Sequence, residues 1–126
     1  TNPNKRIDDI CRKMEIEHFL DRKMRELSPG ELRWIYLSAY IAADTKILLI
    51  DEIEQHLSKS NLSHLIKVLY RKSNYDGVTI IATTQNKDLF TQRLASVTIT
   101  LENGRITSVR STNRKRKNSG KKKYSK

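Results

Sequence analysis

The first half of the chain alternates between helical segments and one extended run. A stripe of apolar side chains predicts a helix over residues 7–26, with a short break near Glu17; its members are Ile7, Ile10, Met14, Phe19 and Leu20. Ser28-Pro29-Gly30-Glu31 interrupts the stripe and predicts a helix start, because serine caps helices, proline suits the first turn and glutamate completes a capping box. The new helix runs over 32–43 and is apolar enough to be heavily buried. Four apolar residues, 47–50, then predict a central parallel strand that is buried on both faces.

The second half continues this alternation and ends in a hairpin. The expected elements are an amphipathic helix, a β-branched strand, a short helix and two further strands, over residues 61–72, 78–83, 87–94, 97–101 and 105–109. Asn103-Gly104 lies between the last two strands and is a strong signal for a tight hairpin turn. Since strands and helices alternate, the pattern predicts an α/β fold with a parallel sheet.

The positive charge is concentrated at the end of the chain. The net charge is +11, and residues 110–126 hold nine lysines and arginines but no acid. We therefore expect a disordered basic tail that binds polyanions such as nucleic acid or an anionic membrane surface. Residues 1–27, 28–109 and 110–126 are interpreted as a helical segment, a core and this tail. Since no secretory signal and no membrane-spanning run is visible, we expect a cytoplasmic location.

Two acids follow the strand expected at 47–50. Asp51 and Glu52 come at its carboxyl end, the edge of an open α/β sheet where ligands bind. An acid there can hold Mg²⁺ through water, and its neighbour can orient an attacking water. Taken alone, this short pattern equally suits a core strand followed by solvated acids.

The spacing of four segments gives the pattern a family resemblance. Leu27-Ser28-Pro29-Gly30-Glu31 resembles the signature motif of ATP-binding-cassette (ABC) ATPases, and the distance to Asp51-Glu52 matches the Walker B position of that family without a gap. Residues 80–84 resemble its switch strand and 101–106 its closing hairpin. The resemblance covers residues 7–109 and implies the C-terminal half of such an ATPase. The implied fold is a partial P-loop-type parallel sheet with flanking helices, a helical subdomain segment at the N-terminus and the closing β-hairpin.

The resemblance implies a role for the signature segment. In ABC ATPases it grips the γ-phosphate of ATP held on the opposite subunit, so we expect a dimer. Ser28 and Gly30 carry that role over, beside Pro29 and Glu31 in the same cofactor-binding segment. A serine hydroxyl at a helix N-terminus suits phosphate. Pro29 departs from the family glycine and removes one backbone N–H.

The resemblance also implies the residues of hydrolysis. Asp51 would position Mg²⁺ and Glu52 would polarise water, as the cofactor-binding and catalytic carboxylates. Gln85 stands where the family has its switch histidine and would sense the γ-phosphate; its amide can hydrogen-bond but cannot shuttle a proton. Ser58 replaces the usual D-loop aspartate. Both departures put full activity in doubt.

One motif of the family is missing from the sequence. No Gly-x-x-x-x-Gly-Lys-Ser/Thr occurs, so the α- and β-phosphates of ATP have no backbone cradle in this chain. We therefore expect that ATP hydrolysis needs a P-loop-bearing N-terminal half or a partner ATPase subunit.

Three functions stay open. Residues 7–26 resemble the helical subdomain that transporter ATPases press against a membrane permease, which would bring the chain to the membrane. Residues 51–57 and 82–85 also resemble ABC-type ATPases of DNA repair or phage defence, of the RecF or overcoming-lysogenisation-defect kind, with DNA or a nuclease as partner. A degenerate regulatory subunit without catalysis would fit Pro29, Ser58 and Gln85.

Overall fold

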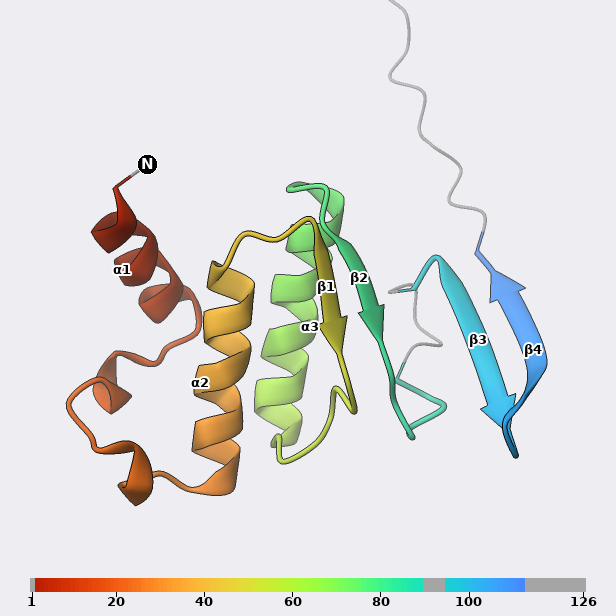
Figure 1. The fold of residues 1–126 in the computed structure, drawn as a ribbon, viewed down its shortest axis with the longest axis horizontal. Coiled ribbons are helices and arrows are strands. Elements are labelled where there is room, and N and C mark those ends of the chain that lie inside the picture. Colours follow the sequence, from red (N-terminus) through yellow and green to blue (C-terminus); the bar gives the residue numbers. More distant parts are fainter. Residues whose placement is uncertain (1, 90–94, 113–126) are drawn as a thin grey trace, which may run out of the picture. The chain divides into compact units, whose positions relative to one another are not determined.

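The computed structural model describes residues 2–89 and 95–112 (Figure 1). They fall into two compact units that divide after Gln85: residues 2–85, and the described residues from 86 to 112. The first unit contains α1 (Pro3–Lys13), two short 3-10 turns (Glu17–Phe19 and Met24–Glu26), α2 (Pro29–Ala42), β1 (Ile47–Ile50), α3 (Lys59–Asn74) and β2 (Thr79–Ala82). The second contains β3 (Val97–Glu102) and β4 (Arg105–Ser111). The expected mixed α/β fold with a parallel pair of strands and a closing hairpin is confirmed.

The N-terminal segment is broken more strongly than its apolar stripe predicts. α1 ends at Lys13, so the helix expected over 7–26 with a short break near Glu17 is wrong beyond that residue, where two 3-10 turns follow instead. Met14 and Ile16 are buried at 0% and 6% exposure, and the Trp34 indole donates a 2.8 Å hydrogen bond to the Met14 carbonyl. If the helix continued, the Met14 carbonyl would instead accept a backbone hydrogen bond within the helix. The chain therefore leaves the helix to anchor on α2.

The cap of α2 follows the sequence prediction. Ser28 is the N-cap, Pro29 stands in the first turn, and Ser28 and Glu31 form a reciprocal capping box. The helix buries one side, with Leu37 and Ile41 in the core, while Tyr36 and Tyr40 stay largely exposed. Burial is therefore less complete than the apolar composition of the helix suggests.

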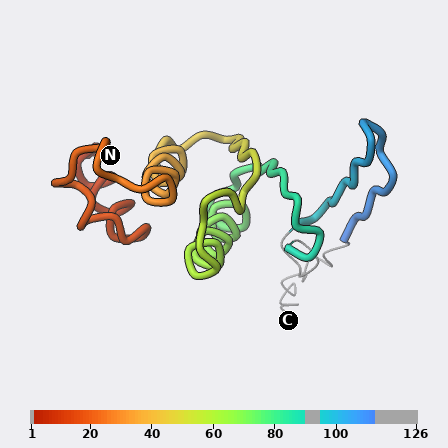
Figure 2. Tube along the Cα trace, turned by 90° about the horizontal axis from the view of Figure 1, so that it is seen from below, coloured from red at the N-terminus to blue at the C-terminus, as the bar shows by residue number. Residues whose placement is uncertain are grey.

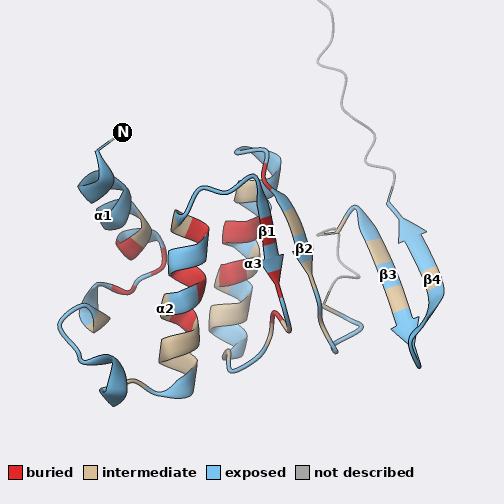
Figure 3. Ribbon diagram, in the orientation of Figure 1, coloured by how far each residue is buried: buried red, intermediate tan, exposed pale blue. Residues whose placement is uncertain are grey.

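β1 and β2 form a parallel pair with Leu48 opposite Ile80 and Leu49 opposite Ile81. In the Cα trace, the helices of this unit lie on one side of the pair (Figure 2). β1 alternates, because Leu48 and Ile50 are buried whereas Leu49 is 69% exposed (Figure 3). The expectation that β1 is buried on both faces is therefore wrong for the part of the chain that the structure describes, since helices cover only one face.

The second unit is an antiparallel hairpin. Asn103 and Gly104 turn with φ of 51° and 74°, the left-handed pair that a tight hairpin turn requires. The register shifts between Thr100 and Leu101, which marks a β-bulge. Residues 87–89, the described part of the helix expected at 87–94, form a turn.

The described residues end shortly after the hairpin. β4 continues to Ser111 and so includes the first two residues of the expected tail, and 113–126 lie outside the described residues. Among the described helices, none is both long and apolar enough to cross a bilayer.

Candidate functional site

Asp51 and Glu52 follow β1 directly and are held by a threonine from the neighbouring strand. The Thr83 hydroxyl donates a 2.6 Å hydrogen bond to Asp51 Oδ1 and accepts a 2.8 Å bond from the Glu52 backbone N–H. Thr83 comes immediately after β2, so the parallel pairing of the two strands brings it to the same sheet edge. One hydroxyl thus fixes the positions of both acids.

The backbone at Glu52 is left-handed, with φ of 46°. For a residue with a Cβ this conformation costs about 1–2 kcal/mol. The turn is closed by the Ile53 N–H, which donates to the Thr83 carbonyl at 3.0 Å, and Ile53 itself is 1% exposed. Such strained residues cluster at functional sites, where surrounding bonds hold them.

Gln85 completes this edge of the sheet. Its side-chain amide donates a 3.1 Å hydrogen bond to Glu52 Oε1, and its backbone N–H donates a 2.8 Å bond to Glu54 Oε1. Gln85 therefore ties the loops after β1 and β2 together at two points, in addition to the bonds of Thr83. The structure brings together Asp51, Glu52 and Gln85, the residues that the sequence singled out for metal binding and hydrolysis.

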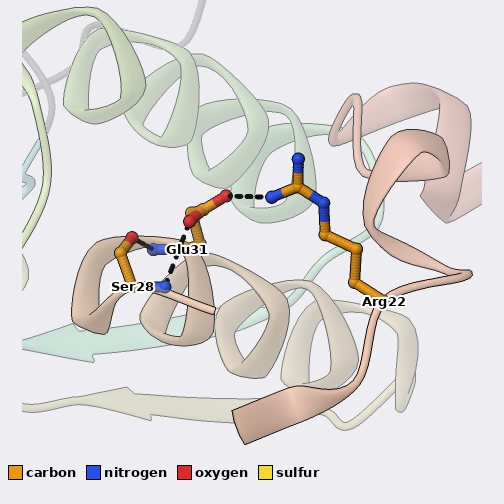
Figure 4. A network of polar contacts seen from close by, with 3 residues as sticks. All are labelled: Arg22, Ser28 and Glu31. Carbon is orange, nitrogen blue, oxygen red and sulfur yellow. Dashed lines mark hydrogen bonds and ion pairs between the residues drawn. The ribbon is translucent and has the colours of Figure 1, made fainter. Parts of the chain in front are cut away.

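The signature segment lies at the N-terminus of α2 (Figure 4). Ser28 Oγ accepts a 3.1 Å hydrogen bond from the Glu31 backbone N–H, and Glu31 Oε1 accepts one of 3.1 Å from the Ser28 N–H. Arg22 approaches the other Glu31 oxygen at 3.4 Å. The pKa of Glu31 is lowered, first by the hydrogen bond from the Ser28 backbone and then by the Ser28 side chain. Glu31 thus serves the cap.

Gly30 allows a close approach between the signature segment and the loop after β1. A Cβ at this position would lie 2.8 Å from the carbonyl oxygen of His56. Real Cβ atoms essentially never come that close to another heavy atom. The glycine predicted for phosphate binding therefore also has a packing role that the motif alone does not reveal.

Two residues at this site were missed by the sequence interpretation. Thr83 was treated only as part of the switch strand, although it bonds both acids. Arg33 on α2 donates through Nη2 to the carbonyls of Asp51 at 2.8 Å and Glu52 at 3.3 Å. A single basic residue in an otherwise apolar run, 32–43, was the available signal for Arg33.

The donor set suits part of a Mg²⁺ site. Mg²⁺ prefers oxygen ligands and is usually held by one or two carboxylates, waters and substrate phosphates. Asp51 supplies one carboxylate, of which Oδ1 already accepts from Thr83. Within residues 2–89 and 95–112, no group of three or more His, Cys, Asp or Glu could hold a metal ion.

The chain was compared with known families. A family model described as "AAA domain, putative AbiEii toxin, Type IV TA system" matches residues 6–90. This match spans α1, α2, β1, α3 and β2, and so includes the site built above.

Curated relatives are ATP-binding proteins by name. The energy-coupling factor transporter ATP-binding protein EcfA3 of Clostridium perfringens is 28% identical over 85 residues, which are 68% of this chain and 30% of the relative. The molybdenum import ATP-binding protein ModC of Mycobacterium tuberculosis is 31% identical over 99 residues, which are 78% of this chain and 26% of the relative. The chain thus spans less than a third of the length of these relatives.

Solved structures give the same fold. The ATP-binding cassette MJ0796, in a dimeric post-hydrolysis state bound to ADP and Pi, matches with a TM-score of 0.74 and 21% identity over 85% of this chain and 46% of that one. The protein cbiO1 from Clostridium perfringens, part of the ABC transporter complex cbiONQ, matches with a TM-score of 0.66 and 24% identity over 84% of this chain and 42% of that one. The chain belongs to the AAA domain family that its residues 6–90 match, and it carries part of an ABC-type ATPase nucleotide-binding domain.

Proposed function

We propose that this chain binds and hydrolyses ATP as one part of a composite ABC-type ATPase site. The observation that carries the proposal is the hydrogen-bonded set of Asp51, Glu52 and Gln85 at the carboxyl ends of two parallel strands. This is the edge of an open α/β sheet where ligands bind. Phosphoryl transfer is catalysed mainly by positioning and by electrostatic stabilisation, which such a set can supply.

Each residue has a defined part in this proposal. Bound Mg²⁺ would neutralise the charge that develops on the phosphates, and Asp51 would hold it. Glu52 accepts a hydrogen bond from Gln85, and its carboxylate would orient and polarise the attacking water. The Gln85 amide would report on the γ-phosphate. Ser28 and Gly30 would bind the γ-phosphate of ATP on a second cassette, through the N-terminus of α2.

The rest of the site must come from outside these residues. The sequence has no P-loop, and the chain spans 46% of the MJ0796 cassette. On the uncovered face of the β1–β2 pair, Ile47, Leu49 and Ile81 are 59%, 69% and 58% exposed. Such an apolar face requires a cover. We propose that a P-loop-bearing half, on another chain or elsewhere in a longer protein, covers this face and supplies the phosphate cradle.

The first candidate for the process that ATP hydrolysis would drive is transport. The curated relatives carry names of transporter ATP-binding subunits, among them a molybdenum import protein and energy-coupling factor proteins. A dimer of cassettes on a membrane permease would then be the working assembly, located at the cytoplasmic side of the membrane.

The second candidate is an ATPase of DNA repair or phage defence. The family description names a putative toxin of a toxin–antitoxin system. Glu54, within the segment 51–57 that resembles these ATPases, accepts a 2.8 Å hydrogen bond from the Gln85 backbone N–H and so contributes to the site. Residues 110–126, with nine basic residues and no acid, would then contact DNA.

A magnesium titration tests the proposed site. In the assembled ATPase, Asp51→Asn should raise the Mg²⁺ concentration for half-maximal turnover about tenfold or more, because the carboxylate charge is lost. Asp76→Asn, on an exposed residue paired with Lys72, serves as the control. An unchanged Mg²⁺ requirement in Asp51→Asn would remove Asp51 from the metal site.

Polyanion binding separates the two candidates. Deleting residues 113–126 should lower the affinity for DNA or for anionic vesicles, and the lost affinity should depend steeply on salt, because counterion release drives such binding. At matched salt, preference for DNA supports repair or defence, and preference for vesicles supports transport. Binding that is unchanged by the deletion would exclude a polyanion role for the tail.

A further inference from the structure

We propose that Arg33 is a positioning residue that ties the signature helix to the catalytic carboxylate of the same chain. This inference rests on the proposed function, because it assigns Glu52 the hydrolytic role. Arg33 touches no nucleotide in this account. It acts on the Glu52 carboxylate indirectly, by holding the backbone of residues 51 and 52.

Arg33 donates two hydrogen bonds to the turn after β1. Its Nη2 donates to the carbonyl of Asp51 at 2.8 Å and to the carbonyl of Glu52 at 3.3 Å. Its Nε is buried and has no hydrogen-bond partner among the described residues. The side chain lines a small hollow beside β1 together with Leu37 and Tyr40. The guanidinium is thus held in place by packing as well as by the two carbonyls.

The turn that Arg33 holds sets the direction of the Glu52 carboxylate. Glu52 is left-handed, with φ of 46°, and its carboxylate lies 3.1 Å from the Gln85 amide nitrogen. Thr83 holds the N–H groups of this turn, and Arg33 holds its carbonyls. Without Arg33, the two carbonyls lose their cationic donor and the turn can relax toward ordinary backbone angles.

Arg33 also lies one helical turn after the Ser28 cap. Gly30, between them, lies so close to the His56 carbonyl, at the far end of the same loop, that a Cβ there would be 2.8 Å from the carbonyl oxygen. The first two turns of α2 therefore approach both ends of the loop of residues 51–56. A displacement of the signature helix on binding a phosphate would reach Glu52 through Arg33. Phosphate contact at one site of a dimer would thereby be coupled to the carboxylate of the other.

Amide hydrogen exchange tests whether Arg33 holds the turn after β1, and it requires no ATP turnover. In the full chain, we expect Arg33→Met to speed exchange of the Glu52 and Ile53 amides about tenfold or more, while amides of β1 between 47 and 50 change less than twofold. Arg33→Lys should give a smaller rise, because an ammonium retains charge but lacks the planar fork. Arg71→Met, an exposed arginine on α3, is the matched control. Equal exchange in all variants, or a rise spread over β1 as well, would overturn the proposal. If Arg33→Met does not fold, Arg33→Lys alone decides by the same criterion.

Steady-state kinetics test the functional part in the assembled ATPase. Arg33→Met should lower kcat about tenfold or more and leave the KM for ATP within twofold, because only the carboxylate is misplaced. A rise in KM with unchanged kcat would overturn the positioning role. If the wild-type assembly hydrolyses no ATP, the proposed function fails, and the exchange experiment still decides whether Arg33 holds the turn.

Discussion

The side-chain amide of Gln85 donates a 3.1 Å hydrogen bond to the carboxylate of Glu52. The two residues are separated by 33 positions and meet because β1 and β2 run parallel and end at one edge. A carboxylate that accepts a hydrogen bond from a neighbouring amide gains a fixed direction. This geometry suits a group that orients water without forming a bond to the substrate.

Replacing the carboxylate tests that role. In the assembled ATPase, Glu52→Gln should lower kcat about 100-fold or more while the Kd for ATP changes little, because the carboxylate polarises water but need not hold the nucleotide. Turnover and equilibrium ATP binding measured on the same preparation provide the comparison. Gln55→Ala, on the same loop, should leave both unchanged. Wild-type turnover in Glu52→Gln would remove this residue from the mechanism.

The Thr83 hydroxyl should matter for both stability and turnover. Thr83→Val removes one group that bonds Asp51 Oδ1 and the Glu52 N–H, so we expect the free energy of unfolding to fall by about 1–3 kcal/mol. Turnover of the assembly should fall as well. Urea unfolding checks the first effect, with Thr79→Val on the exposed side of β2 as control. Equal stability of Thr83→Val and wild type would show that the hydroxyl does not support the site.

Gly30 should be intolerant of a methyl group. Alanine normally stabilises a helix relative to glycine by about 1 kcal/mol. Here its Cβ would lie 2.8 Å from the His56 carbonyl oxygen, so we expect Gly30→Ala to destabilise the fold by about 1–3 kcal/mol. Ser60→Ala, in the exposed first turn of α3, is the control for a small helix substitution. A more stable Gly30→Ala variant would contradict the close approach of α2 to the loop.

The capping box should give the fold a defined response to acid. The pKa of Glu31 is lowered by its hydrogen bonds from Ser28, so the folded state binds this proton less readily than the unfolded chain. The cap therefore contributes stability above the unfolded value of 4.5, and the contribution is lost as pH falls through the lowered folded pKa. As pH falls from 6 to 3, the free energy of unfolding measured with urea should decline less in Glu31→Gln than in wild type. Glu26→Gln, outside the cap, is the control, and identical declines in Glu31→Gln and wild type would contradict the prediction.

Local chemistry allowed part of the fold to be predicted. The cap of α2 and the Asn103-Gly104 turn depend on neighbouring residues, and both were predicted. The end of α1 at Lys13 was not, because it depends on a hydrogen bond between Met14 and Trp34, 20 positions apart. The exposure of Leu49 also escaped prediction, since burial of a strand's second face depends on what covers it.

The candidate site shows the same division. Motif spacing singled out Asp51, Glu52 and Gln85. In the structure Gln85 bonds Glu52 directly, and the Thr83 hydroxyl links Asp51 to the Glu52 backbone. Thr83 and Arg33 contact Asp51 from 32 and 18 positions away in the sequence, and no sequence motif predicts such contacts. The roles of the site residues in catalysis stay predictions, and they depend on the assembly.

The central claim is that this chain supplies the Walker B and signature parts of an ATPase whose P-loop lies elsewhere. Phosphate release with Mg²⁺ and ATP should therefore be measured for the chain alone, for the P-loop-bearing half alone, and for the two together. We predict background rates for each part and turnover for the mixture that is lost with Glu52→Gln. Hydrolysis by the chain alone at about 1 per second or more, or a mixture that binds ATP but never turns it over, would contradict the account.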